Sequence, residues 1–174
     1  MPLLKSGKEV DDIWAFVEDG HELSPGGCMS VSLARFLSEH DVLLARNEAI
    51  GVRLQPNEDP GLLAPHLEHL HLIEVAFPKY TDGRGYSQAQ LLRRRYGYKG
   101  EVRAIGHVLH DQLGLMVRAG IDAMVFESER AEAIYAEAVG ELSEVYQASA
   151  DGRDTAFVKR HQKSGEPKPG EKVS

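Results

Sequence analysis

The chain has 174 residues, which suits one domain with a substantial core, and it carries a formal net charge of -7. This acidic balance argues against nucleic acid as the main partner, because phosphate-backbone binding needs Lys and Arg clustered on one face. The one dense basic run, Arg93-Arg94-Arg95, falls in the last turn of a predicted helix, where cations complement the helix dipole.

The single cysteine, Cys28, excludes a disulfide framework and a thiolate metal cluster within one chain. A reducing cytoplasm is the simplest compartment for such a protein. No segment approaches the ~20 apolar residues of a membrane span, and the first residues do not read as a signal peptide. We therefore expect a soluble, cytoplasmic protein with no membrane partner.

Residues 1–31 are predicted to form an N-terminal β arm. Between residues 11 and 31 the pattern is short and β-like, with turn signals at Asp19-Gly20 and Pro25-Gly26-Gly27. This predicts a small hairpin or arm packed on the main body, with Trp14 as its buried anchor. Residues 151–174 are rich in Lys and Pro and poor in apolar residues, so they are predicted to be a disordered tail.

Residues 32–150 alternate strand and helix four times, which is typical of an α/β domain with a parallel sheet. Helix starts are indicated by Ser32, Asp59-Pro60, Ser87 with Gln90 in capping-box spacing, and Ser128. The predicted strands are Ile50–Leu54, Leu72–Phe77, Val102–Ile105 and Ala123–Phe126. About four parallel strands in β/α units could form an open sheet or half of a β/α barrel.

Ligands of parallel α/β sheets collect at the carboxyl ends of the strands, so the loops after the four strands should converge on one rim. The loop after Phe77 is the most polar of them. We predict that it binds an anion through Lys79, Arg84, Tyr86 and Ser87, because positive charge at a helix N-terminus is unfavourable unless something anionic is present.

The same rim supplies candidates for acid/base catalysis. They are Asp82 in that loop, His107 after the third strand and Glu127 after the fourth. A purely structural interpretation stands beside this one: Asp82-Gly83 is an ordinary turn, Ser87 is a helix cap, and Arg84 and Asp82 could satisfy each other.

The sequence contains no complete motif for binding a specific cofactor. The loop lacks the Gly-Lys-Ser/Thr of a Walker sequence, and the dinucleotide fingerprint needs a third glycine where Gln88 stands. No flavin, haem or iron–sulfur signature is readable, so no cofactor is predicted. The only cluster of histidines consists of His66, His69 and His71, and such spacing can indicate a metal site. A solvated helix face explains the cluster better, so no metal is predicted.

Four stretches of the chain together resemble a bacterial family of unknown function called DUF934. They are residues 77–87 (FPKYTDGRGYS), 100–113 (GEVRAIGHVLHDQL), 12–14 (DIW) and 51–54 (GVRL). Members of that family are often described as oxidoreductase-like and are placed with assimilatory sulfite reduction. The resemblance implies a pathway and a partner, sulfite reductase, but transfers no catalytic residue.

The chain departs from the family pattern at three positions. His107 stands where an aspartate is common, Ala119 where a cysteine is common, and Tyr80 where a phenylalanine is common. The missing cysteine argues against thiol redox chemistry.

Three functions are consistent with these observations. The first is an accessory protein of sulfite reduction whose loop holds a small oxyanion or an acidic group of a partner. The second is an acid/base enzyme acting on an anionic substrate, in which Lys79 and Arg84 neutralise charge. The third is a pure protein-interaction module.

Overall fold

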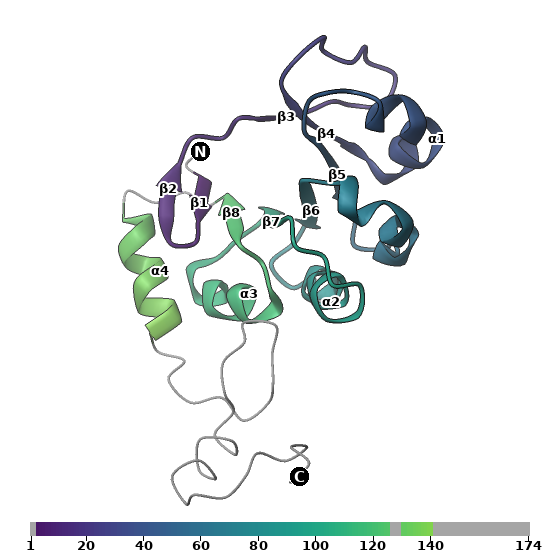
Figure 1. Cartoon of the computed structure of the whole chain (residues 1–174). Coiled ribbons are helices and arrows are strands. Elements are labelled where there is room, and N and C mark those ends of the chain that lie inside the picture. The colour runs from purple at the N-terminus through teal and green to yellow at the C-terminus, as the bar shows by residue number, and fades with distance from the viewer. Residues whose placement is uncertain (1–2, 126–129, 141–174) are drawn as a thin grey trace, which may run out of the picture.

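The computed structural model describes residues 3–125 and 130–140. They form a curled, mixed sheet of eight strands, a half-barrel, with strand order β2-β1-β8-β7-β6-β5-β4-β3 (Figure 1). The strands are β1 (Leu3–Lys5), β2 (Lys8–Val10), β3 (Trp14–Phe16), β4 (Cys28–Ser32), β5 (Ile50–Leu54), β6 (Leu72–Phe77), β7 (Glu101–Gly106) and β8 (Ala123–Val125).

The sheet is larger than predicted and partly antiparallel. Neighbouring strands from β3 through β8 pair in parallel, whereas β1 pairs antiparallel with both β2 and β8. The predicted sheet of about four parallel strands is therefore too small, although β5 and β6 have the predicted bounds. The additional strands are short, and short segments without a long apolar run give a weak sequence signal.

The hairpin predicted within residues 11–31 is wrong. β3 and β4 run parallel, with Trp14 opposite Cys28, so the chain must cross over between them instead of turning back. The N-terminal hairpin is instead β1 and β2, at the opposite edge of the sheet. The link from β2 to β3 spans the open, concave side of the sheet (Figure 1).

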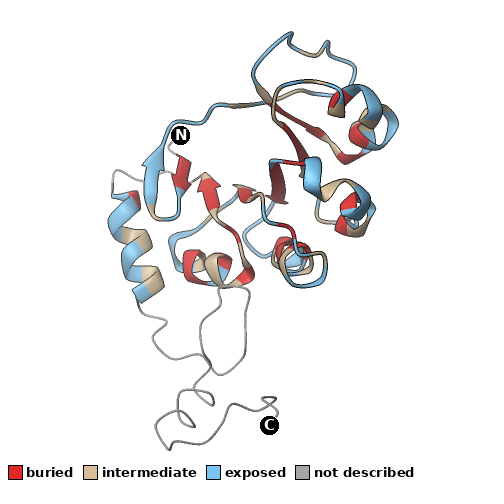
Figure 2. Cartoon of the chain, viewed as in Figure 1, coloured by how far each residue is buried: buried red, intermediate tan, exposed pale blue. Residues whose placement is uncertain are grey.

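The helical segments lie on the convex side of the sheet (Figure 1). They are α1 (Leu33–Leu44), the 3₁₀ segment η1 (Pro60–His69), α2 (Arg84–Gln90) continued by the π-helical turn η2 (Leu91–Arg95), the 3₁₀ turn η3 (His110–Gln112), α3 (Leu113–Ala119) and α4 (Ala131–Gly140). Buried residues gather on the strands and on the sides of the helices that face them (Figure 2).

Two predicted helix caps are confirmed and one is wrong. The Ser32 side chain accepts from the Arg35 amide, and Asp59 accepts from the Gly61 amide just after Pro60. The helix predicted to start after Ser87 begins earlier, at Arg84, so Ser87 lies inside it and cannot cap it. Ser128, a predicted cap, and the predicted tail 151–174 lie outside the described residues.

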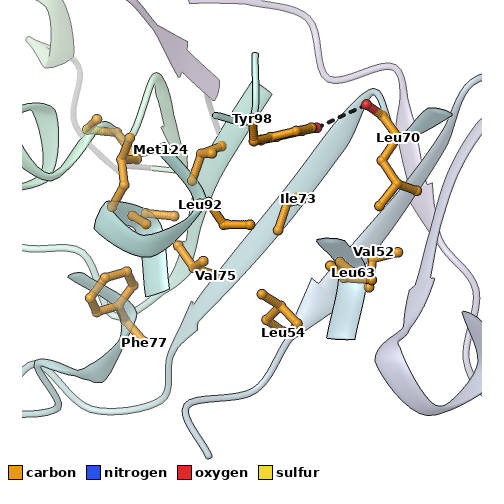
Figure 3. Close-up of a cluster of buried hydrophobic side chains, with 14 of the residues drawn as sticks. Val52, Leu54, Leu63, Leu70, Ile73, Val75, Phe77, Leu92, Tyr98 and Met124 are labelled. Carbon is orange, nitrogen blue, oxygen red and sulfur yellow. Dashed lines mark hydrogen bonds between the residues drawn. The ribbon is translucent and has the colours of Figure 1, made fainter. Parts of the chain in front are cut away.

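The core lies between the sheet and the helices. It takes alternate residues of the strands, as the two-residue period of a strand requires, such as Ile73, Val75 and Phe77 of β6. Leu92 of η2 and Leu63 of η1 belong to the same cluster, and Leu63 lies beside Val52 of β5 (Figure 3). Among the described residues, no helix is both long and apolar enough to cross a membrane.

Candidate functional site

The loop between β6 and α2 lies at the carboxyl end of the sheet, beside the end of β7. The two strands stay in register to their last residues, with Phe77 opposite Gly106. The His107 amide then donates to the Phe77 carbonyl at 2.8 Å, which holds the two loops together. The Gln112 side chain donates to the Tyr80 carbonyl at 2.8 Å. The predicted convergence of these two loops at one rim is therefore present.

Two glycines allow this close approach. Gly106 has φ +96°, and a Cβ added there would lie 2.5 Å from the Phe77 carbonyl oxygen. A Cβ added at Gly85 would lie 2.6 Å from the Phe77 ring. Both positions bring backbone against Phe77 where no side chain fits.

Asp82 and Arg84 form a two-pronged ion pair inside the rim loop. Arg84 Nε donates to Asp82 Oδ1 at 2.9 Å, and Nη2 donates to Oδ2 at 2.7 Å. The Arg84 amide also donates to Oδ1, at 3.2 Å, so the carboxylate sits at the start of α2. The side-chain hydrogen bonds from Arg84 hold the pKa of the Asp82 carboxyl at about 2, below its ordinary 3.8.

This pair changes how the loop's charges are understood. The anion that α2 and Arg84 favour is supplied by the protein itself, as the structural interpretation of the sequence allowed. Lys79 is exposed, its charge also lowers the pKa of Asp82, and its carbonyl accepts from the Asp82 amide at 3.0 Å in the same turn. Counting Lys79, Asp82 and Arg84 together, the loop keeps one net positive charge.

Tyr86 and Ser87 are placed differently from each other. The Tyr86 ring packs edge-on against Phe77, with centroids 5.1 Å apart, and burial raises the pKa of its phenol. Its buried hydroxyl has no hydrogen-bond partner within the described residues. Ser87 is exposed in the middle of α2. The structure therefore does not bring the two hydroxyls together as one ligand set.

The remaining catalytic candidates do not meet Asp82 in a defined acid/base pair. His107 is exposed at the end of β7, and its backbone rather than its ring makes the contact with Phe77. Glu127 lies outside the described residues. Within residues 3–125 and 130–140, the rim groups Lys79, Asp82 and Arg84 as neighbours and places His107 on the adjoining loop.

Sequence reasoning missed a network of charged side chains on the concave face. We call it the concave-face network. It consists of two neighbouring sets of ion pairs, one formed by Lys5, Glu101, Arg103 and Asp12 and the other by Arg53 and Glu74. Arg53, Glu74 and Arg103 occupy one cross-strand row of β5, β6 and β7. The available signal was a charged residue within mostly apolar strands, one in each of β5 and β6 and two in β7.

Arg103 is the centre of the first set of the concave-face network and is only 2 % exposed. Its Nη1 donates to Asp12 at 2.9 Å, and its Nη2 lies 2.8 Å from Glu101. Lys5 reaches the other oxygen of Glu101 at 2.7 Å. Two carboxylates thus neutralise a buried guanidinium, the condition under which such burial is tolerated.

Gln88 connects the rim to the loop after β5 and was not among the predicted site residues. Its amide nitrogen donates to the carbonyls of Gln55 and Glu58, at 2.7 and 2.8 Å. The side chain is buried, and its Oε1 has no partner within the described residues. Gln88 therefore fixes the position of α2 relative to the neighbouring rim loop.

The three histidines of the sequence cluster lie in different surroundings in the structure. The His66 ring packs against Phe36 and His40, at centroid distances of 5.5 and 4.8 Å. His69 and His71 are exposed. No group of three or more metal-ligating side chains is close enough to hold an ion within the described ranges.

A family model described as a bacterial protein of unknown function, DUF934, matches residues 51–157. The matched region begins at the second residue of β5 and includes β6 to β8, the rim loop and the cross-strand row of Arg53, Glu74 and Arg103. No curated protein matches the chain. Because this match covers more than half of the chain, the chain belongs to the DUF934 family.

Proposed function

We propose that the protein is a cytoplasmic, oxidoreductase-like accessory protein of assimilatory sulfite reduction, and that its rim loop binds an anionic group. The pathway comes from the family resemblance carried by residues 77–87 and 100–113. The observation that supports anion binding is the exposed Lys79 beside the Asp82–Arg84 pair, which leaves the loop with net positive charge.

The open geometry favours an acidic group of a partner protein over a small enclosed ion. Arg84 is 59 % exposed even in its ion pair, and Lys79 and Tyr80 are exposed next to it. Exposed charges steer association and set its salt dependence more than they add affinity. Sulfite reductase is the proposed partner, and a small oxyanion is the alternative ligand of the same loop.

The partner is tested by a pull-down from cells grown on sulfate. Tagged wild-type protein should retain sulfite reductase, and the Lys79→Ala, Arg84→Ala double variant should retain much less. Lys99→Ala is the matched control, because Lys99 is exposed at the opposite end of the sheet, before β7. Equal recovery with all three proteins would reject the rim loop as the docking site.

The small-oxyanion alternative is tested by thermal shift with sulfite, sulfate and phosphate. A ligand that binds only the folded state raises the melting temperature. Stabilisation of the wild type that Arg84→Ala abolishes would favour the ion over the partner protein. The pathway has a separate test: deletion of the gene should impair growth on sulfate or sulfite but not on cysteine.

The acid/base enzyme is the weaker alternative. A general base works best when its pKa lies near the working pH, and Asp82, at about 2, is far below neutrality. An oxidoreductase would also need electrons from a partner, because the sequence has no readable cofactor signature. Binding is therefore the role that the rim loop supports best.

A further inference from the structure

Arg53 is held in a fixed orientation on the concave face. Its guanidinium carbon lies 3.6 Å from the centroid of the Phe16 ring, so the cation is held over an aromatic face. Its Nε donates to Glu74 Oε2 at 2.8 Å. The same oxygen accepts from the fully buried Ser30 hydroxyl at 3.0 Å, which fixes Glu74 in turn.

These contacts leave one edge of the guanidinium available. Neither Nη nitrogen of Arg53 has a protein acceptor among residues 3–125 and 130–140, and the side chain is 24 % exposed. Two parallel N–H groups on one edge match the two oxygens of a carboxylate. Little side-chain entropy remains to be lost on binding, because the contact with Phe16 and the Glu74 bond already order the group.

The position of Arg53 is where ligands of parallel sheets bind. It is the residue before the last of β5, close to the carboxyl end of the strand. The partly buried Phe16 provides an apolar wall on one side. Arg103, the buried arginine of the same face, already binds Asp12 and Glu101, whereas the half-buried Arg53 keeps unused donors.

The charge around Arg53 restricts the ligand. Glu74, 4 % exposed, already neutralises the guanidinium, so a dianion would meet a carboxylate without a second compensating charge. A monoanion adds only one charge and can use both Nη groups. We propose that Arg53 binds the carboxylate of a small monocarboxylic acid, in a site separate from the rim loop.

The test is a titration of the ¹⁵N-labelled protein with acetate and propionate at constant ionic strength, followed through the guanidinium resonances of arginine. Both acids should shift the Arg53 signal in a saturable way, with propionate tighter because its extra methylene contacts Phe16. Sulfate at the same ionic strength should shift it less. Absence of saturable shifts with both monocarboxylates would overturn the proposal.

Three variants distinguish binding at Arg53 from binding elsewhere on the protein. Arg53→Lys keeps the positive charge beside Glu74 but removes the two parallel N–H donors of the guanidinium. It should weaken acetate binding at least about tenfold, because one charge-assisted hydrogen bond is lost. Phe16→Leu should weaken binding while leaving the β4 and β5 amide resonances in place. Arg84→Ala should bind acetate like wild type, and an equal loss there would assign the effect to the rim loop and reject the Arg53 site.

Discussion

The Arg84 guanidinium donates to both carboxylate oxygens of Asp82, two residues earlier in the chain, at 2.9 and 2.7 Å. The pair closes the turn that leads into α2, because the Arg84 amide and guanidinium both donate to the Asp82 carboxylate. It also determines what the loop offers to a ligand, because Asp82 competes with any external anion for Arg84. Lys79 is therefore the first contact we expect an incoming acidic group to make.

The pKa of Asp82 should depend on Arg84. A pH titration of the carboxyl ¹³C resonances should give a pKa of about 2 in the wild type, moving up towards the ordinary 3.8 in Arg84→Ala. Since the folded pKa is the lower one, the pair stabilises the fold above pH 3.8 and loses this contribution as the pH falls towards 2. Arg84→Lys should give an intermediate value, and an unchanged pKa in Arg84→Ala would show that the pair does not form in solution.

Removal of Arg103 should be costly. Arg103→Ala leaves Glu101 and Asp12 without their central partner, and breaking a buried ion pair in this way costs about 3–5 kcal/mol. Urea denaturation would measure the change in the free energy of unfolding. Lys5→Ala removes an exposed partner of the same Glu101 and should cost less than about 1 kcal/mol. Similar losses in the two variants would contradict the central role of Arg103.

Gly106 should not tolerate a side chain. Gly106→Ala combines the left-handed backbone, φ +96°, with a clash against the Phe77 carbonyl. Gly27 has a similar φ of +93° with nothing near the added Cβ, so Gly27→Ala measures the backbone cost alone, about 1–2 kcal/mol. Thermal denaturation should show a clearly larger loss for Gly106→Ala. Equal losses would mean that the two rim loops can move apart at little cost.

Tyr98 should make the protein sensitive to alkali. Its buried hydroxyl donates to the Leu70 carbonyl at 3.2 Å, and burial raises the pKa of the phenol above its ordinary 10 (Figure 3). The raised folded pKa means that stability is intact below pH 10 and falls as the pH rises beyond it, where the unfolded chain ionises first.

Tyr98→Phe should lose about 1 kcal/mol at neutral pH, the net value of one buried hydrogen bond, and should show a smaller alkaline loss. Denaturation in urea at neutral and alkaline pH would measure both effects. Tyr80→Phe, at a side chain 62 % exposed, is the control and should change neither quantity by more than about 0.5 kcal/mol. The same alkaline loss in wild type and Tyr98→Phe would assign it to another group.

Local sequence pattern is enough to predict several parts of this protein. The apolar runs of β5 and β6, each interrupted by a single charged residue, predict their bounds, because strands covered on both faces need mostly apolar residues. Ser32 and Asp59 predict helix starts, because a cap is a hydrogen bond between near neighbours. Residues 77–87 and 100–113 carry the resemblance to the family, and the family match over residues 51–157 includes both stretches.

Which distant residues meet is set by the tertiary structure alone. β3 joins β4 in parallel, and Asp12 reaches Arg103 across 91 positions of the chain, because the curl of the sheet and the crossing of the β2–β3 link bring them together. The same holds for Phe16 over Arg53. Cross-strand register and long-range ion pairing leave no periodic signal along the chain. Charged residues inside the strands are therefore only exceptions to an apolar pattern until the fold places them side by side.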